Sequence, residues 1–265
     1  MLTYLSFLAG GIAGAIYYRE RRERVALERL GAASLETLLD AIDANNPETG
    51  AHVRRVAEYA LVLAIAADLD ERAERSVERV ALFHDVGKLD GAITDIISDT
   101  GKLTAEERRS IMSHPGKGAD VLQPLGAFYP ELPIGVLTHH ERWDGEGYPR
   151  HLRGASIPIE ARIVAIADTF DAVTQSRSYS HARTLETATA IIAEGRGTQF
   201  DPDLVDLFLS PPVMKDVGRL LRQAHTPRKA SSRRRRNSAS ASVPDVTFRW
   251  RTPSPLLPHR GPRHP

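Results

Sequence analysis

The chain has 265 residues, of which 42% are hydrophobic and 26% charged, so it can bury a sizeable core and is too hydrophobic to be disordered throughout. It has no cysteine, which excludes disulfides, a thiolate nucleophile and thiolate metal sites. The net charge of +1 is unevenly distributed, because residues 1–210 carry 22 Lys and Arg against 32 Asp and Glu, whereas residues 211–265 carry 13 against 2. The sequence therefore predicts an acidic body followed by a basic tail.

The chain opens with an uncharged, mostly apolar stretch from Leu2 to Tyr18, and an arginine-rich segment follows at once. This length is at the lower limit for crossing a hydrocarbon core about 30 Å thick. A cleaved signal peptide fits this segment less well, because positive charge precedes the apolar stretch in such peptides and here it follows. We expect residues 1–18 to form a single-pass anchor in the cytoplasmic membrane and residues 19–33 a charged linker helix, which leaves the rest of the chain in the cytoplasm. An apolar N-terminus without a membrane role is the alternative.

Apolar residues recur at helical spacing over residues 34–210, and no alternating run of strand length interrupts them. We therefore predict an all-α bundle, with His84 on the inward stripe that contains Val77 and Val80. Helix starts are expected at Ser34, at Asn46–Pro47, at Thr104 in a capping box with Glu107, at Pro133, at Pro158 and at Asp201–Pro202. The helix after Thr104 is expected to end near His114, because Pro115 follows.

Histidines and carboxylates gather on or beside the predicted inward faces. The set consists of Glu48, His52, His84, Asp85, His114, His139, His140 and Asp168. Burying several such groups is costly unless each is paired, and a divalent cation satisfies many of them at once. Nitrogen and oxygen ligands without sulfur suit manganese, iron or zinc, and the set exceeds what one ion can use. We predict at least two ions, an arrangement suited to phosphoester hydrolysis because adjacent ions polarise a phosphoryl group and activate water.

Two motifs among these residues carry a family resemblance. His84-Asp85-Val86-Gly87-Lys88 resembles the signature of the HD phosphohydrolase superfamily. The run from His139 to Pro149, HHERWDGEGYP, is similar nearly letter for letter to the motif of the HD-GYP subfamily, and Asp168 to Tyr179 continues it. The resemblance covers residues 34–209.

The resemblance implies an HD-type helical bundle with a di- or trinuclear metal centre, acting as a cyclic-di-GMP phosphodiesterase with the products pGpG, GMP or both. It implies divalent ions, Fe or Mn above others, held by His52, His84, Asp85, His114, His139, His140 and Asp168. Asp85 would bridge the ions, and Glu48 matches an acidic residue of members that hold a third ion. The implied catalytic residues are His84, Asp85 and Lys88.

The resemblance also implies contacts to substrate. The residues concerned are Lys88, Asp144, Gly147, Tyr148, Pro149 and Arg177, of which Lys88 and Arg177 would face phosphate and Tyr148 would pack on a base. In the family the Gly147–Pro149 loop is also credited with binding diguanylate cyclase partners. The chain departs from the family at Ser178 and Ser180, where proline and a basic residue are usual. We expect an active enzyme, because all the implied metal ligands are present, and a weaker substrate affinity, because one basic residue is absent.

Two alternatives stay open at this point. The first keeps the fold and the metals but changes the substrate to another cyclic dinucleotide or a nucleotide. The second is a catalytically silent signalling module that binds a partner through the Gly147–Pro149 loop.

The tail over residues 211–265 is rich in proline and serine and contains the run Arg233–Arg236. Such a composition cannot bury enough apolar surface to offset its ordering entropy, so we expect most of it to be disordered. Binding to anionic lipid and a solvated tail without a partner are both open. No specific nucleic acid is expected, because aromatic residues do not interleave with the arginines.

Overall fold

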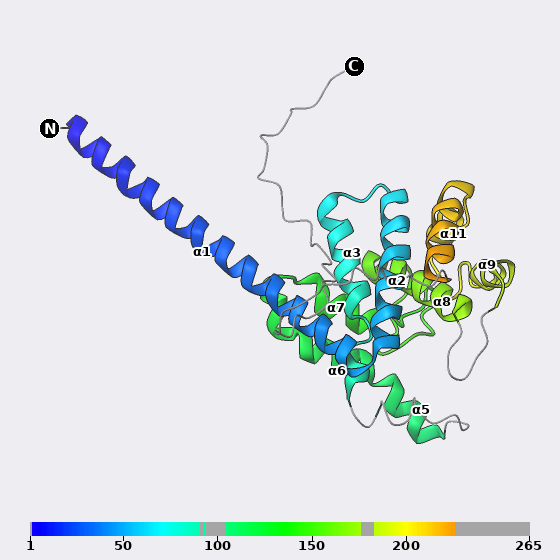
Figure 1. The fold of residues 1–265 in the computed structure, drawn as a ribbon. Coiled ribbons are helices and arrows are strands. Elements are labelled where there is room, and N and C mark those ends of the chain that lie inside the picture. The colour runs from blue at the N-terminus through cyan, green and yellow to red at the C-terminus, as the bar shows by residue number, and fades with distance from the viewer. Residues whose placement is uncertain (1, 91–92, 94–103, 176–182, 226–265) are drawn as a thin grey trace, which may run out of the picture. The chain divides into compact units, whose positions relative to one another are not determined.

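The computed structural model describes residues 2–90, 93, 104–175 and 183–225 (Figure 1). These residues form α1 (Leu2–Asn45), α2 (Pro47–Ala66), α3 (Glu71–Phe83), η1 (Val86–Leu89), α5 (Ala105–Met112), α6 (His114–Leu122), η2 (Gln123–Ala127), α7 (Glu131–Thr138), η3 (Gly154–Ser156), α8 (Ile159–Thr174), α9 (Leu185–Glu194), α10 (Pro202–Phe208) and α11 (Pro211–His225). The described ranges contain an isolated bridge between Arg196 and Phe200 and no named strand. The predicted all-α class is confirmed.

Helix α2 packs against α1, α3, α8, α10 and α11, so it forms the centre of the bundle. The apolar stripes predicted from spacing face this core, where Val56, Val80 and Ile166 are fully buried. The Phe170 ring lies between two others, 5.2 Å from Tyr59 and 5.4 Å from Phe208. Each such side chain stabilises the fold by about 1.5–3 kcal/mol through burial. This packing fixes α2, α3 and α8 against one another, and these helices position His52, His84, Asp85 and Asp168.

Several helix starts lie where the sequence predicts them. The Asn46 side chain accepts hydrogen bonds from the backbone of Glu48 and Thr49, at 3.0 and 3.1 Å. Thr104 and Glu107 form the reciprocal capping box. The Asp201 side chain caps α10 by accepting from the next residues of that helix. Local side-chain chemistry therefore sets these boundaries.

The predicted helix start at Ser34 is wrong. Residues 2–45 form one continuous helix, α1, which includes the segment 19–33 that was expected to be a separate linker helix. Ser34 Oγ donates to the carbonyl of Leu30, 2.9 Å away, as a serine does inside a helix rather than at its start. Near its end, α1 buries Leu35, Leu39 and Ile42 in the core.

Among the described residues, no helix combines the length and the hydropathy needed to cross a membrane. The anchor predicted over residues 1–18 is therefore not supported. Leu2 to Tyr18 form the first turns of α1, where Gly10, Gly11 and Gly14 dilute the apolar character.

The region around His114 also differs from expectation. His114 does not end a helix; it begins α6, and Pro115 occupies the first turn, where its missing N–H is not needed. The sequence pattern does not predict α6, because Gly116 and Gly118 weaken the helical signal there. Gly118 packs against η1 and α7, since an added Cβ would lie 3.0 Å from Val136 and 3.3 Å from Val86.

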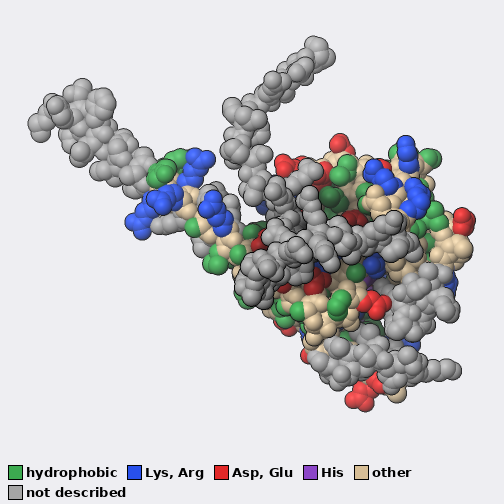
Figure 2. Space-filling model, viewed as in Figure 1, with side chains coloured by type: hydrophobic (Ala, Val, Ile, Leu, Met, Phe, Trp, Pro, Cys, Tyr) green, Lys and Arg blue, Asp and Glu red, His purple; other side chains and the backbone are tan. Residues whose placement is uncertain are grey.

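The ordered body extends past residue 210. Pro211–His225, the first part of the predicted tail, forms α11, which buries Val213 and Val217 and packs against α2. Lys215, Arg219 and Arg222 are exposed on this helix, and Figure 2 shows basic side chains gathered there. The chain divides into two units, Met1–Thr226 and Pro227–Pro265. The second unit, with the arginine run and its predicted disorder and lipid binding, lies outside the described residues.

Candidate metal centre

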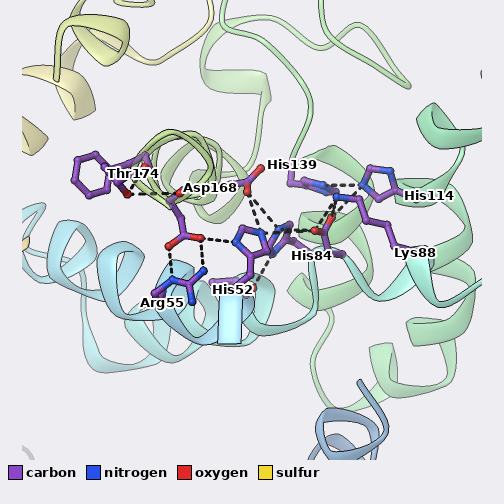
Figure 3. A network of polar contacts seen from close by, with 12 residues as sticks. His52, Arg55, His84, Lys88, His114, His139, Asp168 and Thr174 are labelled. Carbon is purple, nitrogen blue, oxygen red and sulfur yellow. Dashed lines mark hydrogen bonds and ion pairs between the residues drawn. The ribbon is translucent and has the colours of Figure 1, made fainter. Parts of the chain in front are cut away.

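Six of the predicted ligands form two groups inside the bundle. Figure 3 labels four of them, His52, His84, His114 and His139. His52, His84 and Asp85 make the first group, and His114, His139 and His140 make the second; within each group the ligand atoms lie within 4.8 Å of one another. All six are buried except His140, which is half-buried. Residues distant in the sequence thus converge because α2, α3, α6 and α7 end or pass at one place.

Asp85 connects the first group to the second. One carboxylate oxygen is 3.4 Å from His84 Nε2 and 3.7 Å from His52 Nε2, and the other is 3.4 Å from His114 Nε2. The turn that carries Asp85 lies directly against α6, because a Cβ at Gly87 would overlap the carbonyl of His114. The glycine in the His-Asp motif therefore permits the close approach that joins the groups.

Three imidazoles are oriented by the backbone. The Nδ1 atoms of His84, His114 and His139 lie 2.8, 2.7 and 2.7 Å from the carbonyls of Ala81, Ile111 and Val136, each three residues earlier. Since a carbonyl only accepts, these nitrogens carry the proton, and the Nε2 lone pairs point into the centre. His84 Nε2 is fully buried and has no hydrogen-bond partner in the described part of the chain. A buried acceptor of this kind fits a metal ligand.

The second group is held in the neutral state that metal binding requires. Burial lowers the pKa of His114 to about 3 and that of His140 to about 4. Burial, reinforced by the neighbouring His140, also brings the pKa of His139 well below its usual range. Imidazole binds metal only when deprotonated, so this group needs no proton release at neutral pH.

His52 has a different environment. Its Nε2 lies 3.2 Å from Asp168 Oδ1, and its Nδ1 lies 2.7 Å from Asp171 Oδ2. Burial opposes protonation, but these two carboxylates outweigh it and raise the pKa of His52 to about 9. Burial likewise opposes ionisation of Asp168, but its hydrogen bond to His52 and the nearby His84 hold the pKa of Asp168 far below its ordinary value. Asp168 thus adds a seventh predicted ligand, adjacent to the first group.

Glu48 lies apart from both groups. It is exposed in the first turn of α2, and its backbone N–H donates to the Asn46 cap. Neither group of clustered ligand atoms includes it. Its place in the first turn of α2 is one where an acidic side chain is favourable without any metal, because it interacts with the positive end of the helix dipole.

Lys88 reaches into the centre from η1. Its Nζ lies 2.7 Å from the Asp85 carboxylate. Burial acts to raise the pKa of Asp85, but Lys88 and the neighbouring His84 and His114 hold it well below the usual range. Asp85 is therefore an anion next to a cation at the edge of the metal centre.

Four of the predicted substrate residues, Asp144, Gly147, Tyr148 and Pro149, lie on the loop after His140. Tyr148 stacks on the His140 ring, with centroids 5.0 Å apart and planes at 26°. Gly147 is buried, and a Cβ there would overlap the backbone of Glu141 and Arg142. Pro149 follows Tyr148 and is exposed.

Asp144, the fourth predicted substrate residue of this loop, is engaged within it. It pairs with Arg142 and accepts from the backbone of Glu146. Arg177, Ser178, Tyr179 and Ser180 lie outside the described residues.

Three residues around the centre, Asp171, Arg55 and Glu141, are not among those predicted from the sequence. Asp171 is fully buried between His52 and Arg55, and Arg55 Nε and Nη2 donate to its two oxygens at 2.7 and 2.9 Å. Glu141 is buried and accepts from the backbone of Arg150 and Leu152, which closes the loop. The sequence spacing does indicate that two of these residues lie beside predicted ligands. Arg55 follows His52 by three residues and Asp171 follows Asp168 by three, and residues three apart share a helix face.

Comparison with known proteins identifies the scaffold. The HD domain family matches residues 36–204. The chain belongs to the HD domain family. This confirms the resemblance found in the motifs, and the HD phosphodiesterases of this family depend on metals, which suits the two groups.

Two curated relatives are similar over most of the described body. The chain is 39% identical over 194 residues to the cyclic di-GMP phosphodiesterase response regulator RpfG of Xanthomonas campestris pv. campestris, covering 72% of this chain and 48% of that protein. It is 40% identical over 174 residues to 3'3'-cGAMP-specific phosphodiesterase 2 of Vibrio cholerae, covering 65% and 33%. The chain thus spans less than half the length of these relatives.

A solved structure, an HDG"Y"P protein from Bdellovibrio bacteriovorus, matches with a TM-score of 0.51 at 16% identity, covering 68% of this chain and 60% of that one. At this identity the match shows the fold alone.

Proposed function

We propose that this chain is a metal-dependent phosphodiesterase that hydrolyses cyclic-di-GMP to pGpG, GMP or both. The observation that carries the proposal is the placement of Asp85, whose two oxygens face imidazoles of both groups at 3.4 Å. One carboxylate shared by two sets of nitrogen ligands is the arrangement expected for two adjacent divalent ions. The relatives named for cyclic di-GMP and 3'3'-cGAMP hydrolysis supply the substrate class.

The donor set supports iron or manganese. His52, His84 and Asp168 would hold one ion and His114, His139 and His140 the other, with Asp85 between them. Imidazole and carboxylate without thiolate suit these metals. When bound, the ions supply Lewis-acid polarisation of the phosphoryl oxygens and an activated water. A third ion would need Glu48 as an additional ligand, and that residue is exposed.

The protein's own residues orient the candidate ligands and stabilise charge on the phosphate. The backbone carbonyls behind His84, His114 and His139 fix the inward nitrogens before substrate arrives, so no reorganisation is needed during the reaction. Lys88 places a positive charge beside Asp85, where negative charge grows on the phosphate. Tyr148 presents an aromatic surface next to the second group, on which a purine can stack.

Which nucleobases the substrate carries is a second question. The two relatives are nearly equally identical to this chain, but one is named for cyclic di-GMP and the other for 3'3'-cGAMP. Either cyclic dinucleotide presents the same phosphodiester to the metal centre. We propose cyclic-di-GMP as the preferred substrate on the resemblance of the HHERWDGEGYP run, and 3'3'-cGAMP as its competitor.

The full chain, purified without oxygen, tests the proposal. Metal content is measured on the same sample as turnover of cyclic-di-GMP and of 3'3'-cGAMP. We expect two ions per chain and hydrolysis, with both lost in Asp85→Ala. Asp206→Ala is the matched control, because it removes an exposed aspartate that pairs with Arg196 at the surface. Full turnover by Asp85→Ala, or a metal-loaded chain that cleaves neither dinucleotide, would contradict the proposal.

A further inference from the structure

His52 differs from the other core histidines in what holds its Nδ1. His84, His114 and His139 use a backbone carbonyl three residues earlier, which is available because each lies at a helix terminus. His52 lies inside α2, where the preceding carbonyls are used by the helix itself. Its Nδ1 partner is instead the Asp171 carboxylate on α8, at 2.7 Å.

Asp171 is itself held from two sides. It is fully buried, and an isolated carboxylate at that depth would be strongly unfavourable. Arg55 compensates for the cost of burying this charge, because its Nε and Nη2 donate to the two oxygens at 2.7 and 2.9 Å in a forked geometry. Arg55 lies on the same helix as His52, so α2 supplies both the ligand and the cation that stabilises the ligand's partner (Figure 3).

We infer that Asp171 and Arg55 are positioning residues of the metal centre: Asp171 orients His52 so that its Nε2 faces Asp85 and Asp168, and Arg55 keeps Asp171 in place. This inference rests on the proposed metal-dependent function. A carboxylate behind a metal-bound histidine fixes the ring and its tautomer and makes the imidazole a stronger ligand. Losing such a partner lowers metal affinity by about tenfold to a hundredfold.

The test uses Co²⁺ as the probe, because its absorption spectrum reports the ligand geometry as well as occupancy. Titration of the metal-free full chain is compared with that of Asp171→Asn. We expect Asp171→Asn to bind one Co²⁺ about tenfold to a hundredfold more weakly, with an altered spectrum, while the ion at the His114 group keeps its affinity. Arg55→Gln should weaken the same ion less, because the bond between Asp171 and His52 remains.

Asp201→Asn is the matched control. It makes the same change in another buried aspartate, which pairs with Arg162 at 2.6 Å, and asparagine can still cap α10. Its Co²⁺ titration should equal that of the unsubstituted chain. Thermal unfolding of the unsubstituted chain and the three variants, all metal-free, shows whether any loss of Co²⁺ binding in Asp171→Asn accompanies a loss of the fold.

A double-mutant cycle separates positioning from general stability. If Asp171 acts through His52, then Asp171→Asn has no further effect on Co²⁺ affinity in a His52→Ala background. Equal Co²⁺ binding by Asp171→Asn and the unsubstituted chain would overturn this inference and leave the proposed function intact, and so would an Asp171→Asn effect that persists without His52. An unsubstituted chain that binds no Co²⁺, Mn²⁺ or Fe²⁺ would overturn both.

Discussion

The ammonium nitrogen of Lys88 lies 2.7 Å from the carboxylate of Asp85, the residue whose oxygens face both histidine groups. Lys88 is one 3₁₀ turn beyond Asp85, so the His-Asp motif carries its own cation. About a quarter of the Lys88 side chain remains exposed, at 27%, which leaves its charge within reach of a phosphate entering from solvent. Asp85 is buried, so the pair is asymmetric: the anion is fixed and the cation is accessible.

Lys88→Met should lower kcat by about tenfold to a hundredfold, because it removes a charge that stabilises the developing negative charge on phosphate. Metal content should not fall, since Lys88 supplies no ligand. Steady-state kinetics and metal analysis on one sample check both parts. Lys117→Met, which removes an exposed lysine paired with Asp90, is the control and should keep full activity. Unchanged kcat in Lys88→Met would reduce Lys88 to a counter-ion of Asp85.

Gly147→Ala should displace the loop that carries Tyr148. A Cβ at Gly147 overlaps the backbone of Glu141 and Arg142, so the loop must shift and the stacking of Tyr148 on His140 is lost. We expect kcat/KM to fall by about a hundredfold, as a shift of roughly 1 Å near reacting groups does.

Gly116→Ala is the matched control for this loop substitution. Nothing lies within 4 Å of an added Cβ at Gly116, inside α6, so alanine there should leave activity unchanged and stabilise the fold by up to about 1 kcal/mol. If the two alanine variants have equal kcat/KM, the loop geometry does not matter to catalysis.

Acid should destabilise the metal-free protein through His114. Its pKa is about 6.5 in an unfolded chain and is lowered by burial to about 3 in the fold. Between these values the unfolded chain binds a proton at this position and the folded chain does not. The free energy of unfolding therefore falls by about 1.4 kcal/mol for each pH unit below about 6.5, from this residue alone.

Urea unfolding of the chelator-treated chain at about pH 7 and about pH 5 measures this slope. His114→Gln should reduce the slope by the contribution of one proton, because glutamine does not titrate. An equal slope in the variant would show that His114 is protonated alike in both states.

Tyr59→Phe should not destabilise the fold. The Tyr59 hydroxyl is fully buried and has no hydrogen-bond partner among the described residues, so its removal ends an unfavourable desolvation. We expect the free energy of unfolding to stay the same or rise by about 1 kcal/mol. Ile166→Val, which removes one methylene from the same core, should lower it by about 1 kcal/mol and calibrates the measurement. A loss of more than about 1 kcal/mol in Tyr59→Phe would mean that the hydroxyl has a partner.

Local patterns predicted the elements that local chemistry determines. The capping box at Thr104 and the cap at Asn46 need only neighbouring residues, and the inward position of His84 follows from the stripe of α3. The helix start predicted at Ser34 was wrong because a serine can either cap a helix start or donate to a carbonyl inside a helix. The sequence alone does not decide between these two roles.

Long-range pairing was the part that the sequence could not supply. Asp171 and Arg55 are 116 positions apart, so nothing local shows that they meet. Glu141 stands in a recognised motif, but its role depends on a loop that returns to it at Arg150. The candidate ligands could be proposed from their residue types, whereas the contact of His52 with Asp171 depends on the packing of α2 against α8.

The helix ends around the centre have an electrostatic consequence of their own. Helices α3 and α7 both terminate there, with His84 and His139 as their C-terminal caps. The C-terminus of a helix carries the negative pole of its macrodipole. Together with Asp85 and Asp168, the two poles favour a cation at this place. A bound cation would in turn offset this negative potential for the anionic substrate that we propose, so the two helix ends favour metal binding ahead of substrate binding.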